Sequence, residues 1–343
     1  MKKLLNTLYI TTPERYLFLD GENVVIREKD QAVARIPLHN LEEIITFGAL
    51  GASPQLIGKC ISDGISFVFM DRYGRFLYRA EGGVSGNVLL RRRQFRMADN
   101  MDEGLKIARN ITAGKIFNSR YSLERTIRDH AMRIDVDKFR KKSVFLLENA
   151  KKCREAESLE QLRGFEGESA SIYFSCFDDM ILQQKEYFSF SIRNKRPPLD
   201  NVNALLSFVY SLMTGMCSHA LESVGLDPYV GFIHTDRPGR RSLALDLVEE
   251  FRSVICDRFV LTIINKRVIS GKDFQKREDG AVLLTEDGRK TVLNSWQKYK
   301  YETLQHPFLG EKVERGMLPY VQALLLARFI RGDLEGYPVF LWK

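Results

Sequence analysis

The chain has 343 residues, of which 44% are hydrophobic and 28% charged, as in a globular protein with a sizeable core. Its formal net charge of +8 favours a polyanionic partner such as nucleic acid. No apolar run approaches the roughly 20 residues that a membrane-spanning helix needs, so we expect a cytoplasmic protein without membrane association.

The cysteines give a second compositional indication. There are five of them, scattered and never spaced as Cys-x-x-Cys. This pattern argues against a disulfide framework and against a zinc site. It predicts reduced, mostly buried thiols.

Residues 1–95 predict a small, mostly β domain. Residues 16–19 and 24–26 flank the turn Asp20-Gly21, which is typical of a β-hairpin. Ser53 is placed to cap a helix that covers residues 54–61. Further strands are expected at residues 32–36, 42–47, 65–70 and 76–78. Nothing in this region is typical of a catalytic site.

The sequence changes character at Gly82, Gly83 and Gly86. Arg91, Arg92 and Arg93 follow, and three consecutive guanidinium groups suit charge-assisted contacts with DNA phosphates. A solvated basic patch at a domain junction explains the same residues equally well, because charge alone does not separate the two.

Residues 96–343 predict a large, mainly α-helical domain, so the fold class is α+β with a small N-terminal mostly-β domain. One β-hairpin is expected within it, with strands at 281–285 and 289–293. The stretch 102–150 carries many basic residues, Lys115 among them, which are either simply solvated or suited to a DNA backbone. Helical spacing covers residues 102–150, 159–190 (as one helix or two), 201–224, about 294–304 and 315–332.

The stretch 231–252 holds the most informative pattern. His234 lies in a loop, and Ser242 is placed to cap the helix that follows. Asp246 and Glu249 share one stripe of that helix, and most of its remaining surface is apolar, so we expect it to be buried. Because buried carboxylates need a partner, His234 and the two acids are candidates for a cation site.

Plainer explanations of this stretch stay open. A lone His is more often a satisfied core or surface residue, and an acidic helix stripe is more often solvated. Four arginines also stand close in sequence, and they supply enough positive charge to neutralise the acids without a metal: Arg237, Arg240, Arg241 and Arg252.

Gly164-Phe165-Glu166-Gly167 adds a further acid. Helical spacing puts Glu166, Ala170 and Tyr173 on one face and Glu168 nearly opposite. The small neighbours of Glu166 leave open space around its carboxylate. Such space suits an acid that another molecule must approach.

Four strings now stand in a fixed order along the chain. They are Gly164-Phe-Glu-Gly167, the stretch from Asn194-Lys-Arg-Pro-Pro-Leu-Asp-Asn to Tyr210, Gly225-Leu-Asp-Pro228 with Gly231-Phe-Ile-His234, and Ser242-Leu-Ala-Leu-Asp-Leu-Val-Glu-Glu-Phe-Arg252. In this order the chain resembles the CRISPR-associated integrases, endonucleases that insert new spacers into CRISPR arrays in antiviral defence. The motifs cover about 90 residues, and the β-then-α layout resembles the family throughout. Length and motif variants are most similar to subtype I-C.

The resemblance implies that Glu166, His234 and Glu249 are the catalytic residues and together hold a divalent cation. Asp246 would support them, either from the outer shell or as an occasional ligand. Oxygen donors with one imidazole suit Mg²⁺ or Mn²⁺ better than zinc. We do not expect Glu168 or Glu250 to bind the ion.

Other residues near these ligands are candidates for DNA contacts. Arg237, Arg240 and Arg241 lie next to His234 in sequence and are expected to bind phosphate. Arg252 either clamps a phosphate or pairs with Glu249. Tyr173 either orients DNA or water, or is simply part of the core.

The resemblance also implies partners. These are double-stranded DNA (a foreign fragment and the CRISPR repeat), a second copy of the chain bound through the β domain, and a small ferredoxin-like CRISPR-associated companion. Two other functions fit the same residues. One is a metal-dependent nuclease that acts on branched or single-stranded DNA in repair, and the other is a non-enzymatic DNA-binding scaffold whose acids pair with arginines.

Overall fold

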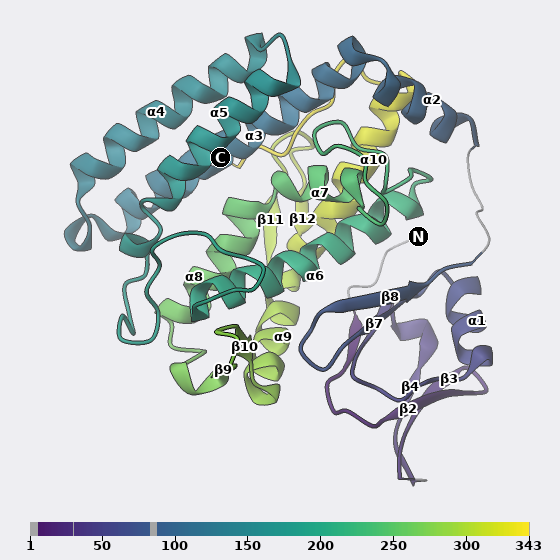
Figure 1. Cartoon of the computed structure of the whole chain (residues 1–343). Coiled ribbons are helices and arrows are strands. Elements are labelled where there is room, and N and C mark those ends of the chain that lie inside the picture. Colours follow the sequence, from purple (N-terminus) through teal and green to yellow (C-terminus); the bar gives the residue numbers. More distant parts are fainter. Residues whose placement is uncertain (1–5, 30, 83–87, 343) are drawn as a thin grey trace. The chain divides into compact units, whose positions relative to one another are not determined.

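The computed structural model describes residues 6–29, 31–82 and 88–342, and the chain forms two compact units (Figure 1). The first unit contains residues 1–85, 271–302 and 315–317, and the second contains the remainder. The expected fold class is confirmed, because a β-rich N-terminal region precedes a mostly helical one. The unit boundary lies after residue 85 rather than 95, and residues 271–302 belong to the first unit. Gly83 and Gly86 lie outside the described residues.

Two four-stranded sheets form the first unit. One has the strand order β1-β5-β7-β8, in which only the pair β7–β8 is antiparallel. The other has the order β4-β3-β2-β6, in which only β2–β6 is parallel. The strands are β1 (Thr7–Ile10), β2 (Tyr16–Asp20), β3 (Asn23–Glu28), β4 (Gln31–Pro37), β5 (Glu43–Phe47), β6 (Gly51–Ala52), β7 (Ser66–Met70) and β8 (Phe76–Ala80).

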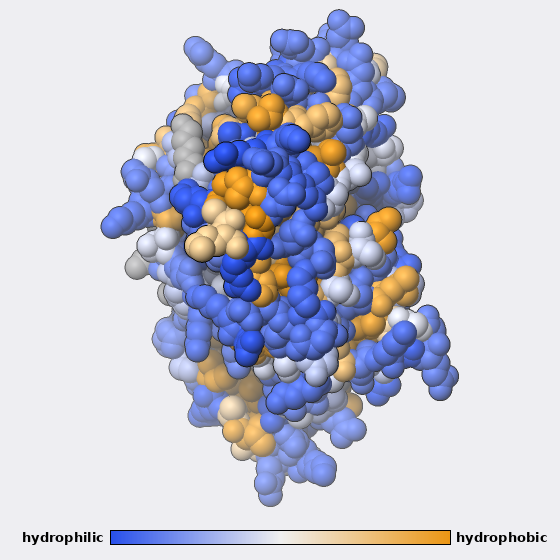
Figure 2. All heavy atoms as spheres, turned by 90° about the vertical axis from the view of Figure 1, so that its left-hand side faces the viewer, coloured by the Kyte–Doolittle hydropathy of each residue, from blue (hydrophilic) through white to orange (hydrophobic). Residues whose placement is uncertain are grey.

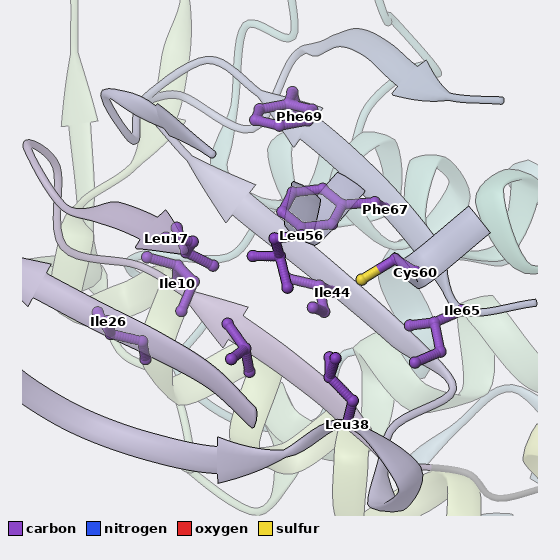
Figure 3. Packing of buried hydrophobic residues seen from close by; sticks show 11 residues of the cluster. Ile10, Leu17, Ile26, Leu38, Ile44, Leu56, Cys60, Ile65, Phe67 and Phe69 are labelled. Carbon is purple, nitrogen blue, oxygen red and sulfur yellow. The ribbon is translucent and has the colours of Figure 1, made fainter. Parts of the chain in front are cut away.

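The core of this unit lies between the sheets and α1 (Pro54–Ser62). Leu17 from β2, Ile44 from β5 and Leu56 from α1 are fully buried and point toward one another (Figure 3). The Ser53 hydroxyl accepts a hydrogen bond from the Leu56 amide, so the expected cap is confirmed. The expected hairpin around Asp20-Gly21 is confirmed as well.

The hairpin expected at residues 281–293 is wrong. β10 (Val282–Leu284) pairs instead with β9 (Phe274–Lys276), and residues after Thr285 form α9 (Glu286–Tyr301). The Thr285 hydroxyl accepts from the Gly288 amide at 3.0 Å, and two acids occupy the first turn. What resembles a turn in the sequence is therefore a helix N-terminus.

Helices build the second unit. Among the described residues, α3, α4 and α5 pack side by side, while α6 packs against α7 and α10 (Figure 1). Its elements are α2 (Val88–Asp99), α3 (Met101–His130), α4 (Val136–Glu155), α5 (Leu159–Phe174), α6 (Asn201–Ser223), α7 (Ser242–Glu249), α8 (Arg258–Asn265), β11 (Thr303–Gln305), β12 (Lys312–Glu314) and α10 (Leu318–Arg331).

Two helix termini differ from expectation. The helix expected over residues 159–190 ends at Phe174, and most of the chain from there to α6 is irregular. Ser242 is the first residue of α7 rather than its cap. Its hydroxyl donates to the Thr235 carbonyl at 3.3 Å. The Pro228 carbonyl accepts the Leu243 and Ala244 amides instead, so the first turn of α7 needs no side-chain cap.

The apolar segments can be compared with the expectation that no stretch of the chain is long enough to span a membrane. One helix in the described part of the chain, α6, is long and apolar enough to cross a membrane by composition, contrary to expectation. However, 61% of its apolar window is buried inside the protein, as in a core helix. The face that carries α4 is mostly hydrophilic, with small apolar patches (Figure 2).

All five cysteines are free and buried, which confirms the prediction of reduced, mostly buried thiols.

Candidate active site

A cavity of about 440 Å³ in the second unit brings the three expected ligands together. Glu166 reaches it from α5, His234 from the loop before α7, and Glu249 from the last turn of α7. Glu166 is far from the other two residues in sequence, and the packing of α3 against α5 and α7 brings it near them. All three expected catalytic residues therefore line one cavity.

Asp246 organises the His234 loop. Its side chain is fully buried and accepts hydrogen bonds from the amides of Phe232 (2.6 Å), Ile233 (3.0 Å) and His234 (3.1 Å). A Cβ at Gly231 would lie 2.7 Å from the Asp246 carboxylate, so only glycine fits this close approach.

Asp246 also fixes the imidazole. Nδ1 of His234 lies 2.6 Å from Oδ1 of Asp246. Because a carboxylate accepts hydrogen bonds, this contact makes Nδ1 the donor and turns Nε2 away from Asp246, toward another partner. The arrangement is the one in which a histidine acts as a ligand.

Glu249 is a buried carboxylate surrounded by cations. Its Oε1 lies 3.3 Å from Nη2 of Arg252, and its Oε2 lies 2.7 Å from Nζ of Lys115. Burial alone would raise the pKa of Glu249, but Arg252, Lys115 and His234 together lower it to about 2. Glu249 is therefore ionised at neutral pH.

Lys115 links the two glutamates. It projects from α3, and its ammonium group donates a hydrogen bond to Oε1 of Glu166 while it pairs with Glu249. One nitrogen thus contacts a carboxylate oxygen from each of the two expected ligands. Both oxygens converge on a single cationic atom.

The fit to a divalent cation can be judged from these donors. The two carboxylates, which already converge on one cation, are the hard oxygen donors that Mg²⁺ and Mn²⁺ prefer, and the oriented imidazole in the same cavity adds one nitrogen donor. No group of three His, Cys, Asp or Glu side chains in the described ranges is close enough to hold an ion as it stands. The donor set suits the ion in chemistry, and Lys115 occupies the point where the two carboxylates meet.

Positive charge predominates in the cavity. Two glutamates face six Lys or Arg side chains, namely Lys115, Arg163, Lys195, Arg237, Arg240 and Arg252. Burial, together with the guanidinium groups of Arg252, Arg193 and Arg196, lowers the pKa of Lys195. Such an excess of cations is typical of a site that binds phosphate groups.

Arg252 and Tyr173 occupy different surroundings. Arg252 lines the cavity, pairs with Glu249 and lies over the Tyr210 ring at 4.8 Å. Tyr173 is buried outside the cavity lining, and its hydroxyl donates to Asp257 at 3.0 Å. The Tyr210 hydroxyl donates to the same carboxyl at 2.6 Å. Tyr173 therefore belongs to the packing beneath the site.

The remaining arginine candidates divide into two sets. Arg237 and Arg240 line the cavity, whereas Arg241 packs over the Tyr229 ring at 5.8 Å. Arg91, Arg92 and Arg93 lie on α2, outside the cavity lining. Arg92 and Arg93 are exposed, and Arg93 pairs with Glu103 at 2.8 Å.

Two acids that we did not expect to bind a cation lie elsewhere. Glu168 accepts a hydrogen bond from Asn149 at 3.0 Å. Glu250 is turned toward the C-terminal segment and accepts from Tyr337, Gln322 and the Phe340 amide. Neither lines the cavity.

Two site residues were not singled out from the sequence, although each left an indication there. Lys115 is the single charged residue between Arg109 and Arg120, in an otherwise uncharged helical stretch. A lone charge in such a stretch is typical of a functional position rather than a solvated face. Lys195 lies in the Asn194-Lys-Arg-Pro-Pro string that supports the family resemblance, without an assigned role.

Comparisons with known proteins show the family to which the chain belongs. Residues 8–298 match the protein family described as CRISPR associated protein Cas1. The chain is 49% identical to CRISPR-associated endonuclease Cas1 1 of Chlorobaculum tepidum and 47% identical to CRISPR-associated endonuclease Cas1 2 of Rhodospirillum rubrum, with 100% of each chain covered.

Solved structures show the same fold at lower sequence identity. A Cas1 protein from Thermotoga maritima is 21% identical, with a TM-score of 0.82 over 97% of this chain and 99% of that one. A casposase bound to integration product is 23% identical, with a TM-score of 0.82 over 97% of this chain and 93% of that one. On the family match and the two full-length relatives, this chain belongs to the Cas1 family of CRISPR-associated proteins.

Proposed function

We propose that this chain is a divalent-metal-dependent DNA endonuclease and integrase that inserts short foreign DNA fragments as new spacers into a CRISPR array. The observation that carries the proposal is the cavity, which combines Glu166, His234 and Glu249 with an excess of cationic side chains. The endonuclease names of the full-length relatives support the same function. Length and motif variants favour subtype I-C.

Each residue of the cavity has a proposed role. The carboxylates of Glu166 and Glu249 and Nε2 of His234 would hold Mg²⁺ or Mn²⁺, and Asp246 keeps the imidazole oriented. When bound, the ion would polarise a phosphoryl oxygen and stabilise charge on the attacking and leaving oxygens. Arg237, Arg240 and Lys195 are the candidates for phosphate contacts.

The reaction is an exchange of one phosphodiester bond for another. The terminal 3′-hydroxyl of the incoming fragment attacks a phosphodiester of the repeat, a new P–O bond forms, and the former neighbour leaves as a 3′-hydroxyl. The guanidinium and ammonium groups of the cavity hold the phosphate in line and offset its charge. Positioning and charge stabilisation supply most of the help in phosphoryl transfer, so few side chains need to react.

The proposed partners are double-stranded DNA, a second copy of the chain, and a small ferredoxin-like CRISPR-associated companion. Proteins of the same fold are described as a casposase bound to integration product and as a Cas6-RT-Cas1–Cas2 complex, which supports DNA and a companion. For the homodimer, strand β8 lies at a sheet edge and exposes Phe76, Leu77 and Tyr78. Exposed apolar side chains of this kind are typical of an interface.

A strand-transfer assay tests the function. Purified protein, with and without the companion, is incubated with Mn²⁺, a repeat-bearing plasmid and a short duplex with free 3′-hydroxyls. Glu166→Gln and Glu249→Gln are expected to lower joining at least 100-fold, because each removes a charged ligand, and His234→Ala is expected to do the same. The yield of plasmid-linked duplex measures the effect.

Glu168→Gln is the matched control. Glu168 lies on the same helix as Glu166 and outside the cavity, so this variant is expected to join DNA as the wild type does. Full joining by Glu166→Gln or Glu249→Gln would remove that residue from the site. Cleavage without joining would favour the branched-DNA nuclease, and no reaction with any substrate would favour the scaffold.

A further inference from the structure

The ammonium group of Lys115 lies at the meeting point of the two glutamates. Asn118, on the same helix, donates to the carbonyl oxygens of Glu250 and Phe340, each at 2.8 Å. These bonds fix α3 against the segment that carries Glu249. The Lys115 side chain is only 14% exposed, so its ammonium group faces the carboxylates instead of bulk water.

The charges explain why a cation is needed at this point. Two carboxylates that approach one another in a partly dehydrated site repel each other unless a positive charge lies between them. Arg252 contacts only Glu249, whereas Lys115 contacts both acids. Lys115 is therefore the group that keeps Glu166 and Glu249 directed at one point.

We propose that Lys115 is the resident counter-ion of the cation site, and that a divalent ion must displace its ammonium group before the glutamates can act as ligands. Mg²⁺ and Mn²⁺ bind carboxylate oxygens at about 2.0–2.2 Å, so the ion and the ammonium nitrogen compete for one position. The four-carbon stem of lysine lets the displaced nitrogen move into the adjoining cavity, where the phosphate is expected. This inference rests on the proposed role of Glu166 and Glu249 in metal binding.

The competition predicts tighter metal binding without the lysine. In Lys115→Met, which keeps the aliphatic stem and loses the charge, the affinity for Mn²⁺ is expected to rise at least tenfold. Titration with Mn²⁺ at fixed pH, followed by the electron paramagnetic resonance signal of the free ion, measures this without any DNA. Lys106→Met, at an exposed position of the same helix, is expected to stay within about threefold of the wild type.

Thermal unfolding gives a second measurement. With EDTA, Lys115→Met is expected to melt below the wild type, because Glu166 loses the cation it pairs with and Glu249 keeps only Arg252. The rise in melting temperature on adding Mn²⁺ is expected to be larger for this variant than for the wild type. Should Lys115→Met fail to fold, Lys115→Gln takes its place in both measurements.

The outcomes separate this inference from the proposed function. Unchanged or weaker Mn²⁺ binding by the uncharged variants, together with loss of binding in Glu166→Gln/Glu249→Gln, would overturn the counter-ion role and leave the metal site standing. Absence of Mn²⁺ binding in every protein, the wild type included, would overturn both. Tighter binding in Lys115→Met, abolished when the two glutamates are also replaced, supports both.

Discussion

Glu250, the residue after Glu249, contacts the C-terminal segment instead of the cavity. Its carboxyl group is fully buried and accepts hydrogen bonds from Gln322 (2.7 Å), the Phe340 amide (2.7 Å) and Tyr337. Burial, opposed by the hydrogen bonds from Phe340, Tyr337 and Gln322, raises the pKa of Glu250 to about 7. This carboxyl group ties the C-terminal segment to the end of α7, directly beside a proposed ligand.

Glu250 predicts a loss of stability as pH rises toward neutrality. The pKa of the folded group is raised above its ordinary value of 4.5, so the folded state binds more protons between these values. The contribution to stability is complete below about pH 4.5 and disappears as pH rises through about 7. Glu250→Gln cannot ionise, so the free energy of unfolding of the variant minus that of the wild type is expected to grow between pH 5 and 8, by at most about 1.4 kcal/mol per pH unit.

Urea unfolding at four pH values checks this prediction. Glu335→Gln, an exposed substitution in the same C-terminal segment, serves as the control and is expected to follow the wild type. A difference between Glu250→Gln and wild type that stays constant with pH would contradict a protonated Glu250.

The residues of the site were predictable to different degrees. The acidic stripe of Asp246 and Glu249 follows from helical spacing, and the structure buries both residues. The sequence did not predict that the Asp246 carboxylate accepts hydrogen bonds from three backbone amides and contacts the His234 ring. Those bonds depend on how the loop folds back over α7. Lys115 meets Glu166 across 51 sequence positions, and only the packing of α3 against α5 brings them together.

Among the elements, local sequence patterns predicted the helices and strands whose conformation tertiary packing does not change. β1, β6 and β9 were not predicted, whereas the strands expected from β2 to β5, together with β7 and β8, and the long helices of the second unit follow from their periodicity. α9 did not, because Thr285-Glu-Asp-Gly288 serves equally as a turn and as a capped helix start. A Cβ at Gly288 would lie 2.4 Å from the Asp273 carbonyl, so glycine is required here because the Asp273 backbone packs against it, not because the chain turns. The sequence alone does not show this contact.

A buried charge joins α9 to the strands of the first unit. Lys300, near the end of α9, donates to the Thr7 hydroxyl at 2.9 Å and interacts with the buried Glu43 carboxyl of β5. Burial lowers the pKa of Lys300 and raises that of Glu43, and each charge opposes the shift of the other. The two residues are therefore expected to depend on one another.

Replacing one of these two charges is expected to destabilise the first unit. Lys300→Met should lower the free energy of unfolding by about 3 kcal/mol, since it leaves the buried Glu43 carboxyl without this cation. Glu43→Gln/Lys300→Met should recover part of that loss, because neither charge remains. Urea unfolding measures both, with Lys298→Met at an exposed position of α9 as the control. Equal losses in the single and double variants would show that the two charges are not coupled.

At the scale of the whole molecule, the net charge and the positions of the charged residues predict two different contributions to DNA binding. The formal charge of +8 attracts DNA from any direction. The cavity places six cationic side chains against two acids, and this local excess is expected to hold phosphates at defined positions. Only the cations that line the cavity are expected to contact individual phosphates.

Salt dependence separates these two contributions. Each phosphate contact with B-form DNA releases counter-ions and steepens the plot of log affinity against log salt by about 0.9. Arg237→Gln/Arg240→Gln removes two cavity cations and is expected to flatten the slope by about 2, as measured by fluorescence anisotropy with a labelled duplex between 50 and 300 mM salt. Arg27→Gln/Arg35→Gln lowers the net charge equally but acts on β3 and β4 of the first unit, so its slope is expected to match the wild type. Equal flattening in both pairs would mean that overall charge, rather than the cavity, binds the DNA backbone, and the phosphate role of Arg237 and Arg240 would then be wrong.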